Sequence, residues 1–147
     1  MANIMVIYYS RTGNTRKMAE LVAEGAGEDG SHQVQLVSTE DVDSVDLPAV
    51  GGFAFGSPDY YSYMAGHLKV VFDGILRNKP QLKNKPFVAF VSHGGGGSAI
   101  KSVESVAQAG AIGLRKVAEG LACKGSPQGA DAEACRQLGR ALAKAVS

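Results

Sequence analysis

The apolar positions of the chain change their spacing repeatedly, which predicts strands that alternate with helices. Residues 3–9 form a nearly continuous apolar run, as expected of a strand that is buried on both faces of a parallel sheet. In residues 14–26 the apolar positions lie three and four residues apart, which predicts a helix with one buried face. Residues 33–37 alternate and are predicted to form a half-covered edge strand. The acidic residues 38–49 are predicted to form a long surface connection.

The rest of the chain repeats this alternation. Residues 50–56 and 87–91 are predicted to be buried strands, and residues 115–123 a weaker fifth strand because they include Glu119 and Gly120. Helical spacing recurs in residues 68–75, 100–107 and 138–145. Such a chain is predicted to adopt an α/β fold with a parallel sheet and right-handed crossovers. Ligands of open sheets bind beyond the carboxyl ends of the strands, so a site is expected after Tyr9, Gly56 and Val91.

Composition and charge narrow the class of protein. A length of 147 residues suits a single domain spanning residues 1–147, and 45% hydrophobic with 20% charged residues is an ordinary globular composition. The net charge of +1 argues against a nucleic-acid binder. The longest apolar run, in residues 4–9, is far shorter than the about 20 residues of a membrane span. A cytoplasmic protein is therefore predicted, and its two cysteines, Cys123 and Cys135, are predicted to be small core or surface residues rather than a redox pair.

The segment after the first predicted strand, Ser10-Arg11-Thr12-Gly13-Asn14-Thr15, has the features of an anion site. The hydroxyls of Ser10, Thr12 and Thr15 can donate to anionic oxygens, and Gly13 lets the backbone approach closely. The free N–H groups and the positive dipole end of the predicted helix face the same spot. These features suit a terminal phosphate. The nucleotide triphosphate pattern G-x-x-x-x-G-K-[ST] and the dinucleotide pattern G-x-G-x-x-G are both absent. The alternative is a plain helix cap, for which one hydroxyl suffices.

The segment from Gly56 to Met64 contains three of the five tyrosines of the chain, Tyr60, Tyr61 and Tyr63. Exposed aromatic area of this size marks a binding site, and a planar aromatic ligand stacked on Tyr60 or Tyr61 would explain it. The alternative is that one or two of these rings pack under the loop.

The segment from Ser92 to Ser98 contains four consecutive glycines. Their bare backbone can lie against the edge of a flat ring and form hydrogen bonds with it. His93 is a candidate donor to the same ligand or, alternatively, a cap of the strand end. A flexible linker, the other interpretation of the glycines, is unusual between a buried strand and a helix of one domain.

Together the three segments resemble the flavodoxin family, and the resemblance covers the whole chain. It implies an α/β fold with a three-layer, doubly wound, five-stranded parallel sheet in the order 2-1-3-4-5. It also implies a short-chain member with FMN as a non-covalent cofactor. The residues that the resemblance places at FMN form a phosphate loop (Ser10, Arg11, Thr12, Gly13, Asn14 and Thr15), a first ring loop (Pro58, Asp59, Tyr60, Tyr61 and Ser62) and a second ring loop (Ser92, His93, Gly94, Gly95, Gly96 and Gly97).

The function that this resemblance implies is low-potential electron transfer, in which the protein binds the cofactor and tunes it. Reductase and acceptor proteins are the expected partners and a monomer the expected state, with no membrane, no catalytic side chain and no metal ligand. The alternative is an enzyme, a flavodoxin-like NAD(P)H:quinone or flavin oxidoreductase that depends on FMN. A phosphoacceptor signalling module would need paired acidic residues after the first strand, where Tyr8, Tyr9 and Ser10 stand.

Two features differ from familiar electron-carrier flavodoxins. No glycine lies between Pro58 and Gly66, so a peptide flip that needs a positive φ there costs about 1–2 kcal/mol. The chain is also nearly neutral, but its charge is uneven: residues 1–73 have four Lys or Arg and ten Asp or Glu (net −6), and residues 74–147 have eleven and four (net +7). In the implied strand order the two halves are predicted to lie on opposite flanks; the alternative is that the charges are mixed in space.

Overall fold

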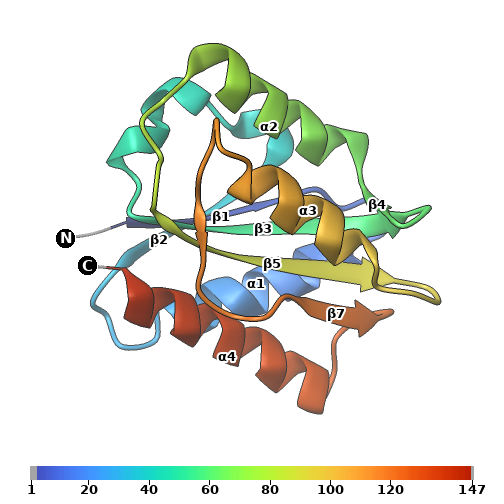
Figure 1. Cartoon of the computed structure of the whole chain (residues 1–147). Coiled ribbons are helices and arrows are strands. Elements are labelled where there is room, and N and C mark those ends of the chain that lie inside the picture. The colour runs from blue at the N-terminus through green and yellow to red at the C-terminus, as the bar shows by residue number, and fades with distance from the viewer. Residues whose placement is uncertain (1–2, 147) are drawn as a thin grey trace.

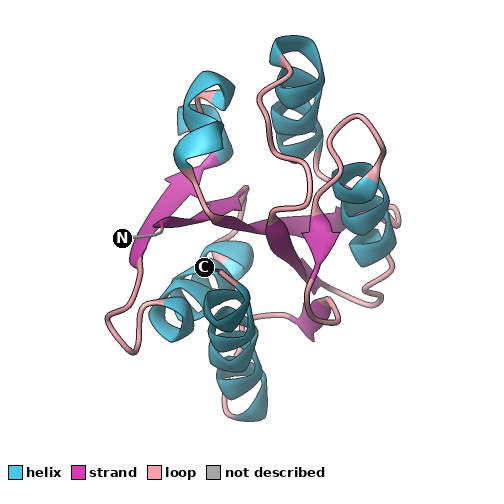
Figure 2. Ribbon diagram, turned by 60° about the vertical axis from the view of Figure 1, so that its left-hand side comes forward, coloured by secondary structure: helices cyan, strands magenta, loops and turns pink. Residues whose placement is uncertain are grey.

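A parallel sheet lies between two layers of helices in the computed structural model of the chain, which describes residues 3–146 (Figures 1 and 2). The strands are β1 Asn3–Tyr8, β2 Gln33–Ser38, β3 Gly52–Tyr60, β4 Tyr63–Met64, β5 Pro86–His93, β6 Arg115–Lys116 and β7 Leu121–Lys124. The helices are α1 Asn14–Ala26, α2 Gly66–Asn78, α3 Ala99–Gln108 and α4 Ala130–Ala145, with 3-10 helices η1 Thr39–Asp41 and η2 Ser44–Ala49.

The order of the strands confirms the predicted doubly wound topology. Strands β2, β1, β3 and β5 lie side by side and parallel, and β6 and β7 share the fifth position beside β5. Only β4 is antiparallel, and it pairs with the end of β3. The loops that follow β1, β3 and β5 therefore meet at one edge of the sheet, at the right of Figure 1, as predicted.

Alternate side chains of the strands supply two cores. Phe53, Phe55 and Phe87 pack with α2 and α3 on one face, whereas Ala54 and Phe90 pack with α1 and α4 on the other (Figure 1). Because both faces are covered, β1, β3 and β5 read as continuous apolar runs. Full burial of each phenylalanine stabilises the fold by about 1.5–3 kcal/mol.

Two glycines allow α1 and α4 to pack closely. A Cβ at Gly25 would lie 2.0 Å from the carbonyl oxygen of Arg136, and a Cβ at Gly139 would lie 2.0 Å from that of Val22. A side chain at either position would force the helix backbones apart. This contact holds α1, and with it the phosphate loop, against the sheet.

The predicted fifth strand is interrupted. Lys116 pairs with Phe87 and Leu121 pairs with Phe90, so four residues face two residues of β5 and the chain bulges out between β6 and β7. The bulge brings Gly120 against α3, where a Cβ would come within 2.6 Å of a side-chain atom. The prediction of one continuous strand over residues 115–123 is therefore wrong.

The predicted surface connection over residues 38–49 contributes to the core. It forms η1 and η2, and Leu47 is completely buried among the residues that pack under α2. The side-chain amide of Asn78 on α2 donates to Ser44 Oγ at 2.5 Å. A single leucine among acidic residues is too weak a pattern to predict this packing.

Candidate cofactor site

The phosphate loop joins β1 to α1 through a left-handed glycine. Gly13 has a φ of 101°, and its N–H donates to Ser10 Oγ at 3.1 Å. No side chain caps the start of α1, and its first turn contains no acidic residue. An uncapped helix start attracts anions, because its N–H groups lack partners and its dipole end is positive.

The two threonines of the phosphate loop are placed differently. Thr12 is exposed, whereas Thr15 is buried and its hydroxyl lies 2.7 Å from the Oγ of Ser92. This bond ties the phosphate loop to β5. If Thr15 accepts the bond from Ser92, its own proton remains available for a ligand.

The first ring loop belongs to a tight hairpin that the sequence did not predict. Tyr60 pairs with Tyr63, and the tip residues Tyr61 and Ser62 have positive φ values of 56° and 68°. Tyr61 is 102% exposed at the tip, whereas Tyr60 is 36% exposed and lines the cavity between the loops. The structure thus separates the two candidate stacking tyrosines.

Asp59 fixes this hairpin and joins it to α3. Its Oδ1 accepts from the N–H of Ser62 at 2.7 Å, and its Oδ2 accepts from the N–H of Ala99 at 3.0 Å. Ser102 adds a third tie, because its Oγ accepts from the N–H of Met64 at 2.9 Å. Both carboxylate oxygens of Asp59 are therefore engaged within the protein.

The second ring loop is bare over most of its length. A Cβ at Gly94, Gly95 or Gly96 would meet nothing within 4 Å, whereas one at Gly97 would lie 2.4 Å from the side chain of Ala122. The Nδ1 of His93 is buried and has no hydrogen-bond partner among the described residues. A buried nitrogen of this kind is available to a ligand.

The three predicted loops meet around one cavity of about 330 Å³, a size typical of small-molecule sites. Its lining consists of Thr12, Asn14, Pro58, Asp59, Tyr60, Ser92, His93, Gly94, Lys124 and Gly125. The other predicted residues of the phosphate loop that reach a hollow, Ser10, Arg11 and Gly13, line an adjacent one of about 460 Å³ that shares Thr12 with the cavity. The structure thus brings the three loops together as predicted. Tyr61, Ser62, Gly95, Gly96, Gly97 and Thr15 do not line the cavity.

Two residues of the cavity were missed, Lys124 and Gly125. Lys124 ends β7 and Gly125 follows it at the same edge of the sheet, and Lys124 lies in register with His93 of β5. Ligands bind at the carboxyl ends of the strands, and this rule applies to the fifth strand too. The residues after its predicted end could therefore have been included in the predicted site.

A stacked pair also escaped prediction. The rings of Tyr9 and His67 lie parallel, with centroids 3.9 Å apart and an interplanar angle of 5°. The contact joins the residue after β1 to the first turn of α2, and so connects the start of the phosphate loop to the segment that follows the first ring loop.

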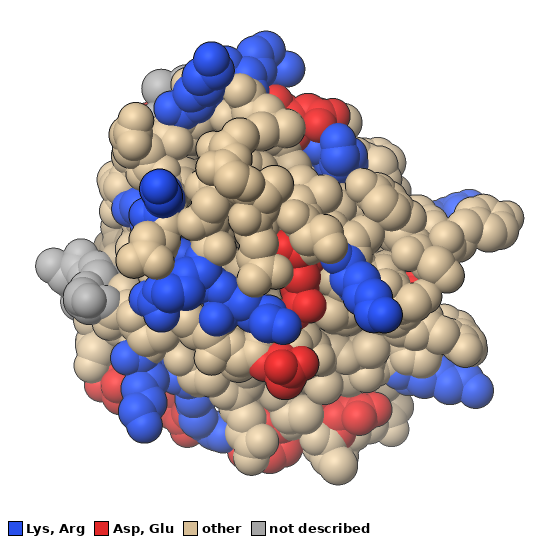
Figure 3. All heavy atoms as spheres, in the orientation of Figure 1, with Lys and Arg blue, Asp and Glu red and all other residues tan. Residues whose placement is uncertain are grey.

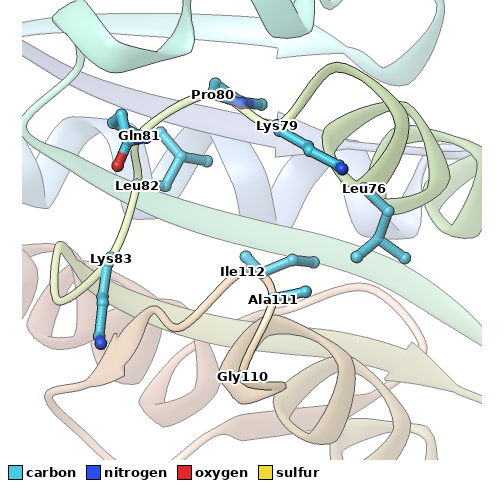
Figure 4. A pocket seen from close by; sticks show the side chains of 9 residues that line it. All are labelled: Leu76, Lys79, Pro80, Gln81, Leu82, Lys83, Gly110, Ala111 and Ile112. Carbon is cyan, nitrogen blue, oxygen red and sulfur yellow. The ribbon is translucent and has the colours of Figure 1, made fainter.

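A separate hollow of about 310 Å³ lies at the opposite edge of the sheet, between the segments that follow α2 and α3 (Figure 4). Leu76, Leu82 and Ile112 contribute apolar groups, and Lys79 and Lys83 contribute ammonium groups at its rim. None of the predicted site residues lines it.

The two cysteines lie in the core that α1 and α4 cover. Both are buried and free, so of the two predicted placements, core or surface, the structure shows the core. Both belong to the same core cluster, which their spacing in the sequence did not reveal. Burial raises the pKa of the Cys135 thiol to about 12 and also raises the pKa of Cys123. Both thiols are therefore protonated and unreactive in the folded protein.

Residues 3–146 contain no group of three metal-ligating side chains and no helix that is long and apolar enough to cross a membrane. The doubly wound sheet and the cavity at its carboxyl edge define an α/β protein of the nucleotide-binding type.

Comparison with known proteins identifies the family. The family described as Flavodoxin matches residues 6–139. A flavodoxin of Aquifex aeolicus is 32% identical, over 100% of this chain and 88% of its own. An NAD(P)H dehydrogenase (quinone) of Chelativorans is 32% identical, over 74% of this chain and 67% of its own. A solved flavodoxin from the domain Archaea superposes with a TM-score of 0.86 at 26% identity, over 97% of this chain and 96% of that one.

The chain belongs to the flavodoxin family, whose members bind FMN and transfer electrons to redox partners. The residues present fit this cofactor. An uncapped helix start suits its phosphate, and the bare glycines with the unpartnered His93 Nδ1 suit the edge of its ring. When bound, FMN supplies the redox chemistry, and the chain supplies its binding and electrostatic surroundings.

Proposed function

We propose that this chain is an FMN electron carrier whose phosphate loop binds the phosphate and whose two ring loops enclose the ring. The observation that carries the proposal is the uncapped start of α1, which opens beside the cavity that all three loops share. The N–H groups of the first turn and the Thr12 hydroxyl donate to the phosphate. Tyr60 covers one side of the ring, and the second ring loop contacts its edge.

A titration of the apoprotein with FMN and with riboflavin tests this assignment. Thr12→Val keeps the volume of the side chain and removes a donor, so the affinity for FMN is expected to fall about tenfold, as for one lost charge-assisted bond. Riboflavin lacks the phosphate, so its affinity is expected to change little. Thr39→Val is the matched control, because the Thr39 hydroxyl is buried, has no partner in the described chain and does not line the cavity. Equal loss for FMN and riboflavin contradicts the assignment.

Thr15→Val sharpens the test. It removes a donor and also leaves the Ser92 hydroxyl without its 2.7 Å partner in a buried position. The free energy of unfolding is therefore expected to fall by about 1–3 kcal/mol in addition to the loss of FMN affinity. The double variant with Thr12→Val is expected to lose at least tenfold in FMN affinity, and unchanged binding would disprove the loop assignment.

Exchange of electrons with reductase and acceptor proteins is the second part of the proposal, with the chain acting as a cytoplasmic monomer. Its rival is direct oxidation of NAD(P)H, which the similarity to a quinone dehydrogenase favours. Stopped-flow mixing of the FMN-loaded protein with NADPH separates the two. The carrier is expected to keep its absorption near 450 nm (roughly, for oxidised flavin) until a flavodoxin reductase is added. Rapid bleaching by NADPH alone favours the enzyme.

A further inference from the structure

Among the described residues, Lys124 is the one ammonium group that lines the cavity between the ring loops. It is the last residue of β7, lies in register with His93 and is exposed. No carboxylate within the described residues forms an ion pair with it. Its charge therefore acts on whatever occupies the cavity.

The cavity holds one opposing charge, and that charge is already engaged. Asp59 is the sole carboxylate in the lining, and two backbone N–H groups donate to its oxygens at 2.7 and 3.0 Å. These bonds hold the carboxylate in a fixed position at the hairpin. Lys124 is thus the one lining side chain among the described residues that attracts an anion by its charge.

From this arrangement we infer that Lys124 makes the cavity bind reduced FMN more tightly than a neutral side chain would, and so raises the reduction potential of the bound cofactor. The inference rests on the proposed function. The reduced ring is an anion at neutral pH and the oxidised ring is neutral, so an ammonium group in the lining stabilises only the reduced form. At a protein surface, where the effective dielectric constant is about 20, one charge at short range is sufficient to change a binding constant tenfold.

A neutral or acidic residue at the end of β7 would leave the reduced ring unstabilised or repelled. Because the ammonium is exposed, its replacement leaves the packing of β7 intact, since Cys123 and not Lys124 faces the core.

The experiment compares Lys124→Gln with Lys83→Gln, which removes the same charge from an exposed position at the opposite edge of the sheet. Apoprotein is titrated with oxidised FMN and with dithionite-reduced FMN, and the reduction potential of the loaded protein is measured against a reference dye. For Lys124→Gln the affinity for reduced FMN is expected to fall about tenfold while that for oxidised FMN changes less than twofold. That ratio corresponds to a drop of about 30 mV for a two-electron couple.

One further variant and one salt measurement test whether the charge of Lys124 causes the change. Lys124→Arg is expected to restore the parent ratio, and 0.5 M salt is expected to narrow the gap between parent and Lys124→Gln, as about 4–5 Å screening at such salt requires. The same ratio in Lys124→Gln, Lys83→Gln and parent overturns the inference, as does an equal shift in both variants. Failure of the parent to bind either form of FMN overturns the proposed function itself.

Discussion

The two walls of the cavity at the carboxyl edge of the sheet are built in opposite ways. The hairpin wall, residues 59–64, is held in place by hydrogen bonds of Asp59 and Ser102 that join its backbone to α3. The glycine wall, residues 94–97, has open space around Gly94, Gly95 and Gly96. One wall is thus positioned before a ligand arrives, and the other has room to adapt to it. A wall that is positioned before the ligand arrives lowers the entropy cost of binding.

The fixed wall carries backbone strain. Tyr61 and Ser62 both have positive φ, which costs a non-glycine residue about 1–2 kcal/mol. The lack of a glycine between Pro58 and Gly66 predicted that such a conformation is costly, and the structure adopts it nevertheless. The bond from the Ser62 N–H to Asp59 offsets the strain.

Removal of Asp59 is expected to have the largest effect on the difference between the fixed hairpin wall and the open glycine wall. Asp59→Ala breaks two bonds to a charged group, and bonds of this kind contribute about 1.5–3 kcal/mol each. We expect the free energy of unfolding to fall by about 3 kcal/mol and the affinities for FMN and riboflavin to fall together, since the ring wall is lost. Urea unfolding and ligand titration measure both. Asp73→Ala, which removes an exposed carboxylate paired with Lys69, is the control and is expected to change neither by much. A parent-like Asp59→Ala would show that the hairpin needs no anchor.

Alanine substitutions within the glycine wall sharpen the comparison. Gly97→Ala places a Cβ 2.4 Å from that of Ala122 and is expected to lower the free energy of unfolding by about 1–3 kcal/mol. Gly95→Ala meets nothing and is expected to raise it by up to about 1 kcal/mol through the unfolded chain. Thermal unfolding of the apoproteins checks the opposite signs. If Gly95→Ala destabilises the apoprotein, the wall is more tightly packed than the structure indicates.

The tyrosines of the hairpin are expected to differ from each other. Tyr60 lines the cavity and Tyr61 points to solvent, so Tyr60→Ala is expected to weaken FMN binding several-fold, as the loss of one aromatic pair worth about 0.5–1.5 kcal/mol implies. An electron-rich ring disfavours the anionic reduced cofactor, so Tyr60→Ala is also expected to raise the reduction potential. Tyr61→Ala serves as the matched control. Redox titrations in which both variants behave like the parent would refute stacking.

The sequence predicted the positions of the loops better than their internal structure. Strand periodicity and the glycine run placed residues 10–15, 58–62 and 92–97 at one edge of the sheet, because parallel strands end together. The role of Asp59 depends on the N–H of Ala99, forty residues away, and no local pattern encodes that distance. The hairpin escaped prediction because its turn uses Tyr61 and Ser62 instead of glycine or asparagine. Lys124 was missed because the bulge before β7 disguised the end of the fifth strand.

The prediction that the two halves of the chain carry their charges to opposite flanks holds only in part. Helix α4 from the basic half lies against α1 from the acidic half, where Arg136 bonds Glu24 at 3.1 Å and Arg140 bonds Glu28. The Arg140 guanidinium lowers the pKa of the Glu28 carboxyl, so both groups stay charged and neutralise each other at neutral pH. On the face seen in Figure 3, Lys and Arg gather toward the side of the termini, with acidic groups interspersed.

The smallest expected effect is therefore that of salt on electron transfer with a protein partner. A nearly neutral molecule with paired charges orients a partner weakly, and exposed charges are screened beyond about 8 Å at physiological salt. We expect the rate at which a flavodoxin reductase reduces the FMN-loaded protein to change only a few-fold between low and high salt. Charge acts mainly on association, so the change should appear in the second-order rate constant and not in the limiting rate. A steep, monotonic fall of the second-order constant with salt would instead reveal a strong charge field at the cavity rim. In that case charged groups near the cavity, and not the overall balance of charge, would control docking of the partner.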